Sequence, residues 1–101
     1  MSVGSVQLAE PGVLSLAGTL DYRSGPQLRK QGAALIASSP ASALVLDCTA
    51  VQQSSSVGLS LLLAFMRDAK AAGKGCEVRG MPHGMREIAE VYGLDDILAL
   101  Q

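Results

Sequence analysis

A short apolar run that passes into a serine cluster and then into an apolar helix constrains this chain more than any other feature. The run covers Ala43 to Leu46, and the cluster is Ser54, Ser55 and Ser56. A continuous apolar run of this length is typical of a strand buried on both faces in a parallel sheet covered by helices. We therefore expect a buried strand, a polar loop after it, and a helix that begins at about Ser56.

The rest of the chain predicts further strands and helices. Glu10-Pro11-Gly12 is typical of a turn between two strands, and Pro26 after Ser24 is typical of a first helical turn with Ser24 as its N-cap. Gly32 interrupts the apolar stripe of that helix and predicts a close contact there. We expect strands at 3–8, 13–17, 43–46 and 76–79, and helices that end at 38, run over 56–72 and begin at 85, with Tyr92, Leu94, Ile97 and Leu98 in the core.

The order strand, strand, helix, strand, helix, strand, helix predicts an α/β fold. Strands that alternate with helices imply right-handed crossovers and a mixed sheet of four to five strands with helices packed against it. The 101 residues fit a single domain, 1–101, and we find no internal repeat or linker. Hydrophobic residues make up 49% of the chain and aromatic residues only 3%, so the core must be aliphatic.

Charge and hydropathy exclude several classes of function. The net charge is −1 with no basic stripe, which argues against nucleic-acid binding. The longest apolar run, Leu61 to Met66, is too short to span a bilayer, and no signal peptide is visible, so we expect a soluble, cytoplasmic protein. Charged residues make up 17%, below the average of about 25%. This is compatible with a partner surface and, equally, with a plain domain rich in small residues.

No pattern predicts a metal, a cofactor or catalysis. Cys48 and Cys76 lie far apart without a second ligand at metal spacing, and we interpret them as inert reduced thiols in the core. Ser56 with the sole histidine, His83, would make a hydrolase only if the two met. There is no Gly-x-Ser-x-Gly turn, so we expect His83 to be a solvated loop residue and the protein not to be an enzyme.

The serine cluster is the strongest candidate site. The three hydroxyls cannot all cap one helix, and Ser56 is open to three interpretations: a plain cap, a phosphorylation acceptor, or a docking contact. Asp21 follows the second strand and is expected to approach the same end of the sheet. The simpler interpretation of Asp21 is a loop carboxylate that accepts hydrogen bonds from local amides.

Three segments resemble the STAS domain family of anti-sigma-factor antagonists and sulfate-transporter tails, and they follow one another along the chain in the same order as in that family. They are Asp47-Cys48-Thr49 followed by Ser54 to Leu59, Leu16-Ala17-Gly18-Thr19-Leu20-Asp21, and Ile88 to Leu94. The chain is most similar to small stand-alone members that serve as subunits of an inner-membrane ABC transporter. That transporter moves phospholipids and maintains outer-membrane asymmetry. The resemblance implies docking on the cytoplasmic ATPase subunit and, through it, association with the permease complex, without direct membrane insertion.

The resemblance also assigns roles to individual residues. Ser56 matches the hydroxyl residue that antagonists phosphorylate and that the transporter subunits use at the ATPase contact. Gly58 and Leu59 match the Gly-Leu pair of the family signature, and Asp21 matches its early acid. In a docking role, we expect Ser54, Ser55 and Val57 to complete the partner-binding segment, with Val57 or Leu59 as its apolar anchor. The acid that usually precedes the key hydroxyl is Ser55 here, which favours constitutive docking over the alternative, an anti-sigma-factor antagonist switched by phosphorylation at Ser56.

Overall fold

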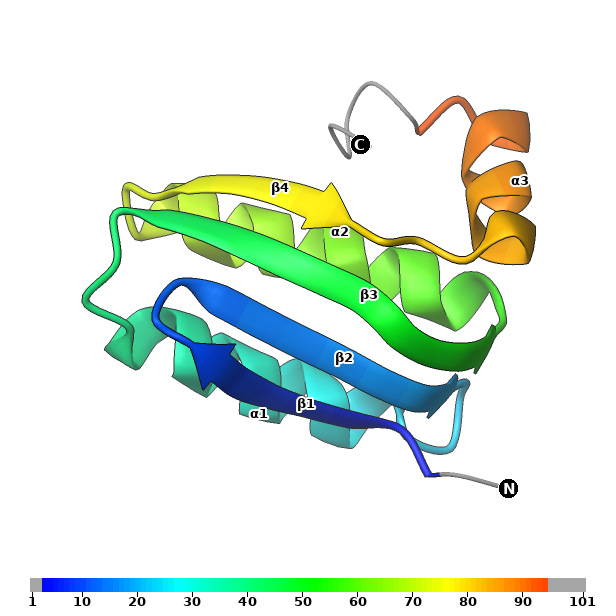
Figure 1. Cartoon of the computed structure of the whole chain (residues 1–101), viewed down its shortest axis with the longest axis horizontal. Coiled ribbons are helices and arrows are strands. Elements are labelled where there is room, and N and C mark those ends of the chain that lie inside the picture. Colours follow the sequence, from blue (N-terminus) through cyan, green and yellow to red (C-terminus); the bar gives the residue numbers. More distant parts are fainter. Residues whose placement is uncertain (1–2, 95–101) are drawn as a thin grey trace.

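Figure 1 shows a computed structural model of the chain, which describes residues 3–94. A four-stranded sheet carries two long helices on one face, and a third, short helix stands beyond the end of the last strand. In chain order the elements are β1 (Ser5–Glu10), β2 (Val13–Leu20), α1 (Gly25–Ser38), β3 (Ala43–Ser54), α2 (Ser56–Ala71), β4 (Gly75–Arg79) and α3 (His83–Val91). The expected core positions Ile97 and Leu98 lie outside the described residues.

The sheet confirms the predicted α/β class and element order. Its strands lie in the order β1-β2-β3-β4, with β1 antiparallel to β2 and the other pairs parallel. The two parallel connections each pass through a helix, so α1 and α2 start at the same end of the molecule. The carboxyl ends of β2 and β3 meet at that end, which is where open α/β sheets generally hold their binding sites.

The core between sheet and helices is aliphatic, as the composition predicts. Alternate residues of β2 and β3, such as Leu16 and Leu46, are fully buried against the helices. The one phenylalanine, Phe65 of α2, lies over Gly32 of α1, where a methyl group would overlap its ring. The close contact predicted at Gly32 is therefore confirmed, and it joins the two helices into one layer.

The third strand is longer than the sequence pattern predicts. We expected it to end at Leu46, but β3 continues to Ser54, and Leu20 of β2 is paired with Ser54. The register shifts twice along this pair, which adds an extra residue to β3 each time. These bulges break the two-residue period of the strand. The buried residues Cys48 and Val51 are therefore not separated by the even spacing that buried strand residues normally have. The expected polar loop is thus the end of a strand.

Three smaller expectations change. Strand β2 does not end at Gly18 but runs on to Leu20. Gly18 lies within the strand with a φ of 77°, where a side chain would meet the Val3 carbonyl. Helix α3 begins at His83 and not at Met85, and Tyr92, expected in the core, is 64% exposed.

Both cysteines are free thiols, and burial raises the pKa of Cys48 to about 12 and that of Cys76 to about 11.

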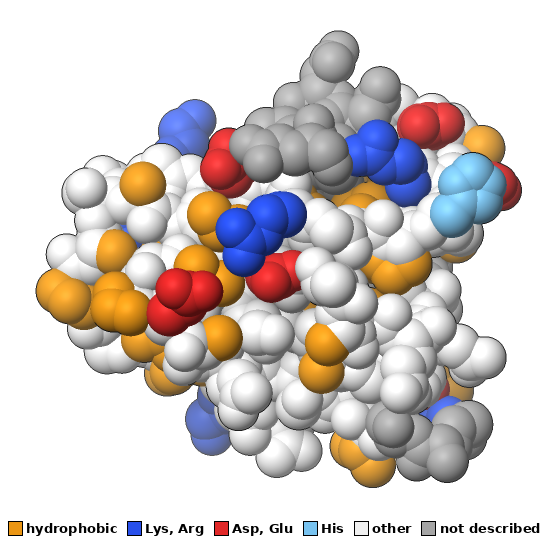
Figure 2. All heavy atoms as spheres, in the orientation of Figure 1, with side chains coloured by type: hydrophobic (Ala, Val, Ile, Leu, Met, Phe, Trp, Pro, Cys, Tyr) orange, Lys and Arg blue, Asp and Glu red, His pale blue; other side chains and the backbone are white. Residues whose placement is uncertain are grey.

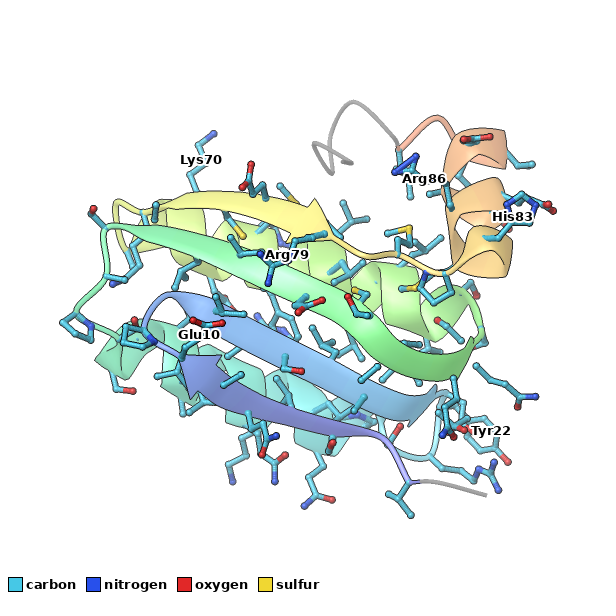
Figure 3. The ribbon with its side chains drawn as sticks, in the orientation of Figure 1. Glu10, Tyr22, Lys70, Arg79, His83 and Arg86 are labelled. Atoms are coloured by element: carbon cyan, nitrogen blue, oxygen red, sulfur yellow. The ribbon has the colours of Figure 1, made fainter. Side chains whose placement is uncertain are left out.

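The face of the sheet opposite α1 and α2 is visible in Figures 2 and 3 and carries a mixture of hydrophobic, polar and charged side chains. Arg79 of β4 pairs with Asp47 of β3 at 3.2 Å, and Asp47 also accepts hydrogen bonds from the hydroxyl and the N–H of Thr49. These bonds, led by that of the Thr49 hydroxyl, lower the pKa of Asp47. This part of the family-like segment therefore holds neighbouring strands together, away from the serine cluster.

Candidate functional site

The three serines form the sharp turn from β3 into α2, at the end of the molecule where both long helices begin (Figure 1). The N–H of Ser55 donates to the carbonyl of Leu20 at 3.0 Å, which ties this turn to the end of β2. The turn is therefore fixed by the sheet itself. We call Ser54 to Val57 the serine turn.

Each serine of the turn has a different role in the structure. Ser55 is the N-cap of α2, and its hydroxyl oxygen accepts from the N–H of Val57 at 3.2 Å. The Ser54 hydroxyl donates to the Ser55 carbonyl at 2.8 Å. Ser56, the first residue of α2, is exposed, and within residues 3–94 its hydroxyl makes no hydrogen bond. The cap is thus assigned to Ser55, and Ser56 is left available to a partner.

Gly58 makes the compact shape of this turn possible. A methyl group at its position would overlap the Ser54 hydroxyl and lie 3.1 Å from the terminal methyl of Met85 in α3. The glycine of the Gly-Leu pair therefore allows β3, α2 and α3 to approach one another closely. Leu59, the next residue, is 3% exposed and packs in the core.

Of the two apolar anchors that the sequence suggests, the structure leaves only Val57 within reach of a partner. The Val57 side chain is half-buried, against Gly25 at the start of α1, and remains partly open at the surface. Leu59 contributes to the fold instead, because its side chain faces the sheet.

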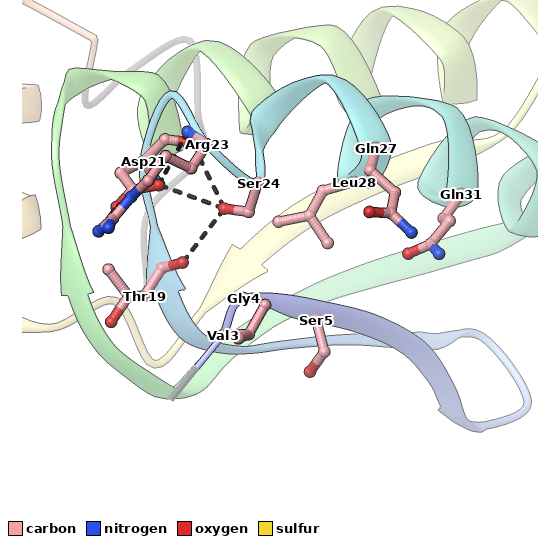
Figure 4. A pocket seen from close by; sticks show the side chains of 10 residues that line it. All are labelled: Val3, Gly4, Ser5, Thr19, Asp21, Arg23, Ser24, Gln27, Leu28 and Gln31. Atoms are coloured by element: carbon pink, nitrogen blue, oxygen red, sulfur yellow. Dashed lines mark hydrogen bonds and ion pairs between the residues drawn. The ribbon is translucent and has the colours of Figure 1, made fainter. Parts of the chain in front are cut away.

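Asp21 lies at the same end of the sheet, as expected from its position after β2. Its carboxylate accepts from the N–H of Arg23 at 3.0 Å and pairs with the Arg23 guanidinium at 2.8 Å. This contact with Arg23 is the main cause that lowers the pKa of Asp21. Figure 4 shows the end of this loop, at Ser24, whose hydroxyl donates to the carbonyls of Thr19 and Asp21. Asp21 therefore shapes the β2–α1 loop beside the serine turn.

A surface hollow of about 520 Å³ lies between the serine turn, the end of β2 and the start of α3. Asp21, Ser54 and Ser55 line it, together with residues that the sequence analysis did not single out: Arg23, Gln52, Gln53, Pro82, Met85 and Ile88. The missed residues come from the β2–α1 loop, the bulged end of β3, and α3 with the residue before it. Gln52 and Gln53 directly precede the serines in the chain, whereas the others reach the serine turn only through the tertiary structure.

The geometry does not bring a catalytic pair together. His83 is 87% exposed and lies 2.5 Å from Glu87 one turn later on the same helix, and within residues 3–94 it has no hydrogen bond to any serine of the turn. No cluster of three or more potential metal ligands occurs among the described residues. Within the same range no helix is long and apolar enough to cross a membrane. What the site offers is a turn tied to the end of β2, with the Ser56 hydroxyl exposed at its surface.

Comparison with known proteins agrees with this description. The family model described as "Mlab, STAS domain" matches residues 4–100. No match was found among curated protein sequences. The MlaB subunit of the Acinetobacter MlaFEDB complex superposes with a TM-score of 0.83 at 21% identity, covering 96% of this chain and 99% of that chain. At this identity the likeness shows the fold alone.

Anti-sigma-factor antagonists are similar as well. One from Mycobacterium paratuberculosis is 31% identical, with a TM-score of 0.78 over 97% of this chain and 83% of that chain. The Bacillus cell fate determinant SpoIIAA in its phosphorylated form is 18% identical, with a TM-score of 0.68 over 98% of this chain and 89% of that chain. The fold is thus common to a transporter subunit and to regulatory antagonists.

Proposed function

The chain belongs to the STAS domain family, and we propose that within it the protein is a non-enzymatic, MlaB-like subunit of an inner-membrane ABC phospholipid transporter. In this proposal the serine turn docks on the cytoplasmic, MlaF-like ATPase subunit and, through it, joins the permease complex. Docking supports the assembly and activity of a transporter that maintains outer-membrane lipid asymmetry. The domain is then held in the cytoplasm, peripheral to the inner membrane.

The proposal rests on one observation, namely that the Ser56 hydroxyl is exposed and makes no hydrogen bond within residues 3–94. Its neighbours Ser54 and Ser55 satisfy the turn internally, so the fold does not need the Ser56 hydroxyl. That hydroxyl and the adjoining Val57 lie on a turn fixed to the sheet, and a rigid surface loses little conformational freedom when it binds. A small hydroxyl side chain also lets the backbone of a partner protein approach closely.

The substitution Ser56→Arg tests docking, with Ser38→Arg as the matched control. Ser38 is also an exposed serine at a helix end, but it closes α1. We expect Ser56→Arg to abolish co-purification with the co-expressed MlaF-like ATPase, because the bulk and charge fall at the centre of the contact. Both variants should keep the circular dichroism spectrum of the wild-type. Recovery of the ATPase in full yield with Ser56→Arg would refute the docking site.

A second function has a specific observation in its favour, namely the 31% identity to a mycobacterial anti-sigma-factor antagonist. In that alternative a kinase phosphorylates Ser56, and the added charge of about −1.5 to −2 repels the partner. The exposed first position of α2 suits a phosphate, because helix N-termini stabilise anions and the first turn of α2 contains no acidic residue. The serine in place of the preceding acid argues against recognition by such a kinase.

Intact-mass measurement of protein purified from its native cells separates the two functions. Constitutive docking predicts one unmodified mass and co-purification of the ATPase. A species heavier by one phosphate, mapped to Ser56 and recovered with a serine kinase, would favour the antagonist.

A further inference from the structure

A second hollow borders the serine turn on the side away from α3. It lies between the first turns of α1 and α2 and has a volume of about 370 Å³. Its walls are mainly apolar: Tyr22 and Pro26 on one side, Val57 and Leu61 on the other. We call it the Tyr22 hollow. Nothing in the established family assignment or in the sequence analysis gives it a role.

Tyr22 is the aromatic residue of this hollow. Both tyrosines of the chain are exposed, Tyr22 at 77% and Tyr92 at 64%, whereas Phe65 is fully buried. Figure 3 shows Tyr22 at the end of the molecule where the serine turn lies. The Arg23 guanidinium lies 5.9 Å from the centre of its ring, and Arg23 is held in turn by Asp21. The exposed ring is thus positioned by the β2–α1 loop.

The hollow and the serine turn form one continuous surface. Val57 belongs to both, and it approaches α1 closely because Gly25 has no side chain; a methyl group there would lie 2.9 Å from a Val57 methyl group. Ser60, which also lines the hollow, donates its hydroxyl to the carbonyl of Ser56 at 3.3 Å. A partner that covers Ser56 and Val57 therefore reaches the hollow without a gap.

The charges around the hollow select an uncharged occupant. Arg29, on its rim, forms two hydrogen bonds with Asp68, at 2.5 and 3.1 Å, and Arg23 is paired with Asp21. A charged side chain entering the hollow would lose hydration without meeting an unpaired counter-charge. An apolar side chain would instead contact the mainly apolar side chains of four residues, two on each side of the hollow.

The size of the hollow also limits what covers it. A stable contact between two proteins buries at least about 1,000 Å² in all, which is more than a surface hollow of about 370 Å³ supplies alone. It fits the role of one pocket within a larger interface. Energetically dominant interface residues are often tyrosines and arginines that surround such pockets.

We propose that the Tyr22 hollow receives an apolar, uncharged side chain of the ATPase subunit and that Tyr22 determines the affinity of that contact. This inference rests on the proposed docking function and extends its footprint from the serine turn across the start of α1. In this arrangement Tyr22 and Val57 contact the inserted side chain from two sides, and Ser56 is the chain neighbour of Val57.

Alanine substitution tests the role of Tyr22, with Tyr92→Ala as the matched control because Tyr92 is an exposed tyrosine at the end of α3. The probe is the purified MlaF-like ATPase encoded in the same genome. We expect Tyr22→Ala to raise the Kd at least about tenfold, Tyr22→Phe to keep wild-type affinity, and Tyr92→Ala to stay within about twofold. A photoreactive benzoylphenylalanine at position 22 should cross-link to an apolar surface residue of the ATPase.

The outcomes separate this inference from the proposed function. If Tyr22→Ala binds within about twofold of wild-type while Ser56→Arg abolishes binding, the role of the hollow is refuted and docking through the serine turn stands. If Ser56→Arg also binds normally, both proposals fail. A cross-link from position 22 to a charged side chain, or no cross-link where the same probe at position 56 reacts, also overturns the proposed occupant.

Discussion

The two ends of the helical layer use their polar groups in opposite ways. At the end where α1 stops and β3 starts, the Lys74 ammonium donates to the carbonyls of Ser39 and Ala41, at 2.5 and 2.7 Å. Ser39 is only 6% exposed, so these bonds satisfy groups that water does not reach freely. At the other end, Ser54 and Ser55 complete the turn, while the Ser56 hydroxyl and the Tyr22 ring remain exposed.

Under the proposed function, this difference separates the stability of the domain from its binding to a partner. The Lys74 end is closed by internal bonds and has a structural role, whereas the serine turn is rigid but leaves groups unused at its surface. Changes at the first end should therefore affect folding with little effect on binding, and changes at the second should do the reverse.

Replacing Lys74 by methionine should destabilise the fold without weakening docking. The substitution leaves the Ser39 and Ala41 carbonyls without their charged donor, and hydrogen bonds to charged groups contribute about 1.5–3 kcal/mol. We expect urea denaturation to show a loss of about 2 kcal/mol, with unchanged ATPase affinity of the folded protein. Lys70→Met, on the exposed last turn of α2, is the control and should change stability much less. Equal losses in the two variants would contradict the structural role of Lys74.

Replacing Gly58 by alanine should have the opposite effect. The added methyl group pushes the Ser54 hydroxyl away from the Ser55 carbonyl and reshapes the serine turn. Stability should stay within about 1 kcal/mol of wild-type, because alanine favours the helix by a similar amount and a hydroxyl rotates easily. We expect the Kd for the ATPase to rise about tenfold, a change of about 1.4 kcal/mol.

The double variant Ser54→Ala with Gly58→Ala checks this explanation, since it removes the hydroxyl that the methyl group displaces. Binding should recover in part. If Gly58→Ala binds normally on its own, the shape of the turn has no part in docking.

The smallest expected effect concerns the open face of the sheet, away from both ends. The Thr49 hydroxyl, followed by the Thr49 N–H and Arg79, lowers the pKa of Asp47, so the folded state favours the carboxylate. Its stabilisation is present above the unfolded pKa of about 3.9 and is lost as the pH falls through the lower folded pKa. Asp47→Asn should cost about 0.5–1 kcal/mol at pH 7, and its difference from wild-type should shrink as the pH falls below about 4.

Urea denaturation at several pH values measures this difference, with Glu90→Gln, an exposed position on α3, as the control. A difference between Asp47→Asn and wild-type that stays constant down to acid pH would show that the carboxylate charge is not its cause.

Element order and fold class were predictable because they depend on local patterns. The apolar run 43–46, the Glu10-Pro11-Gly12 turn and the stripe around Gly32 each report a strand, a turn or a helix contact that a few neighbouring residues determine. The length of β3 was not predictable, since its two bulges destroy the alternation that identifies a strand.

The candidate site was predictable only in part. A hydroxyl cluster before an apolar helix pointed to the serine turn, and the position of Asp21 after a strand placed it at the same end. The identity of the capping serine, the burial of Leu59 and the exposure of Tyr22 depend on how β2, α1 and α2 pack together. No spacing along the chain records those contacts, and Met85 joins the site only because α3 folds back against Gly58.

Hydrogen exchange of the domain alone and in complex with the purified MlaF-like ATPase tests the central claim most directly. We expect binding to slow exchange of the amides at 55–58 and 22–25, while amides near Lys74 and in the β1–β2 hairpin keep their rates. Protection confined to the Lys74 end or to the open face of the sheet, with the serine turn unchanged, would contradict it.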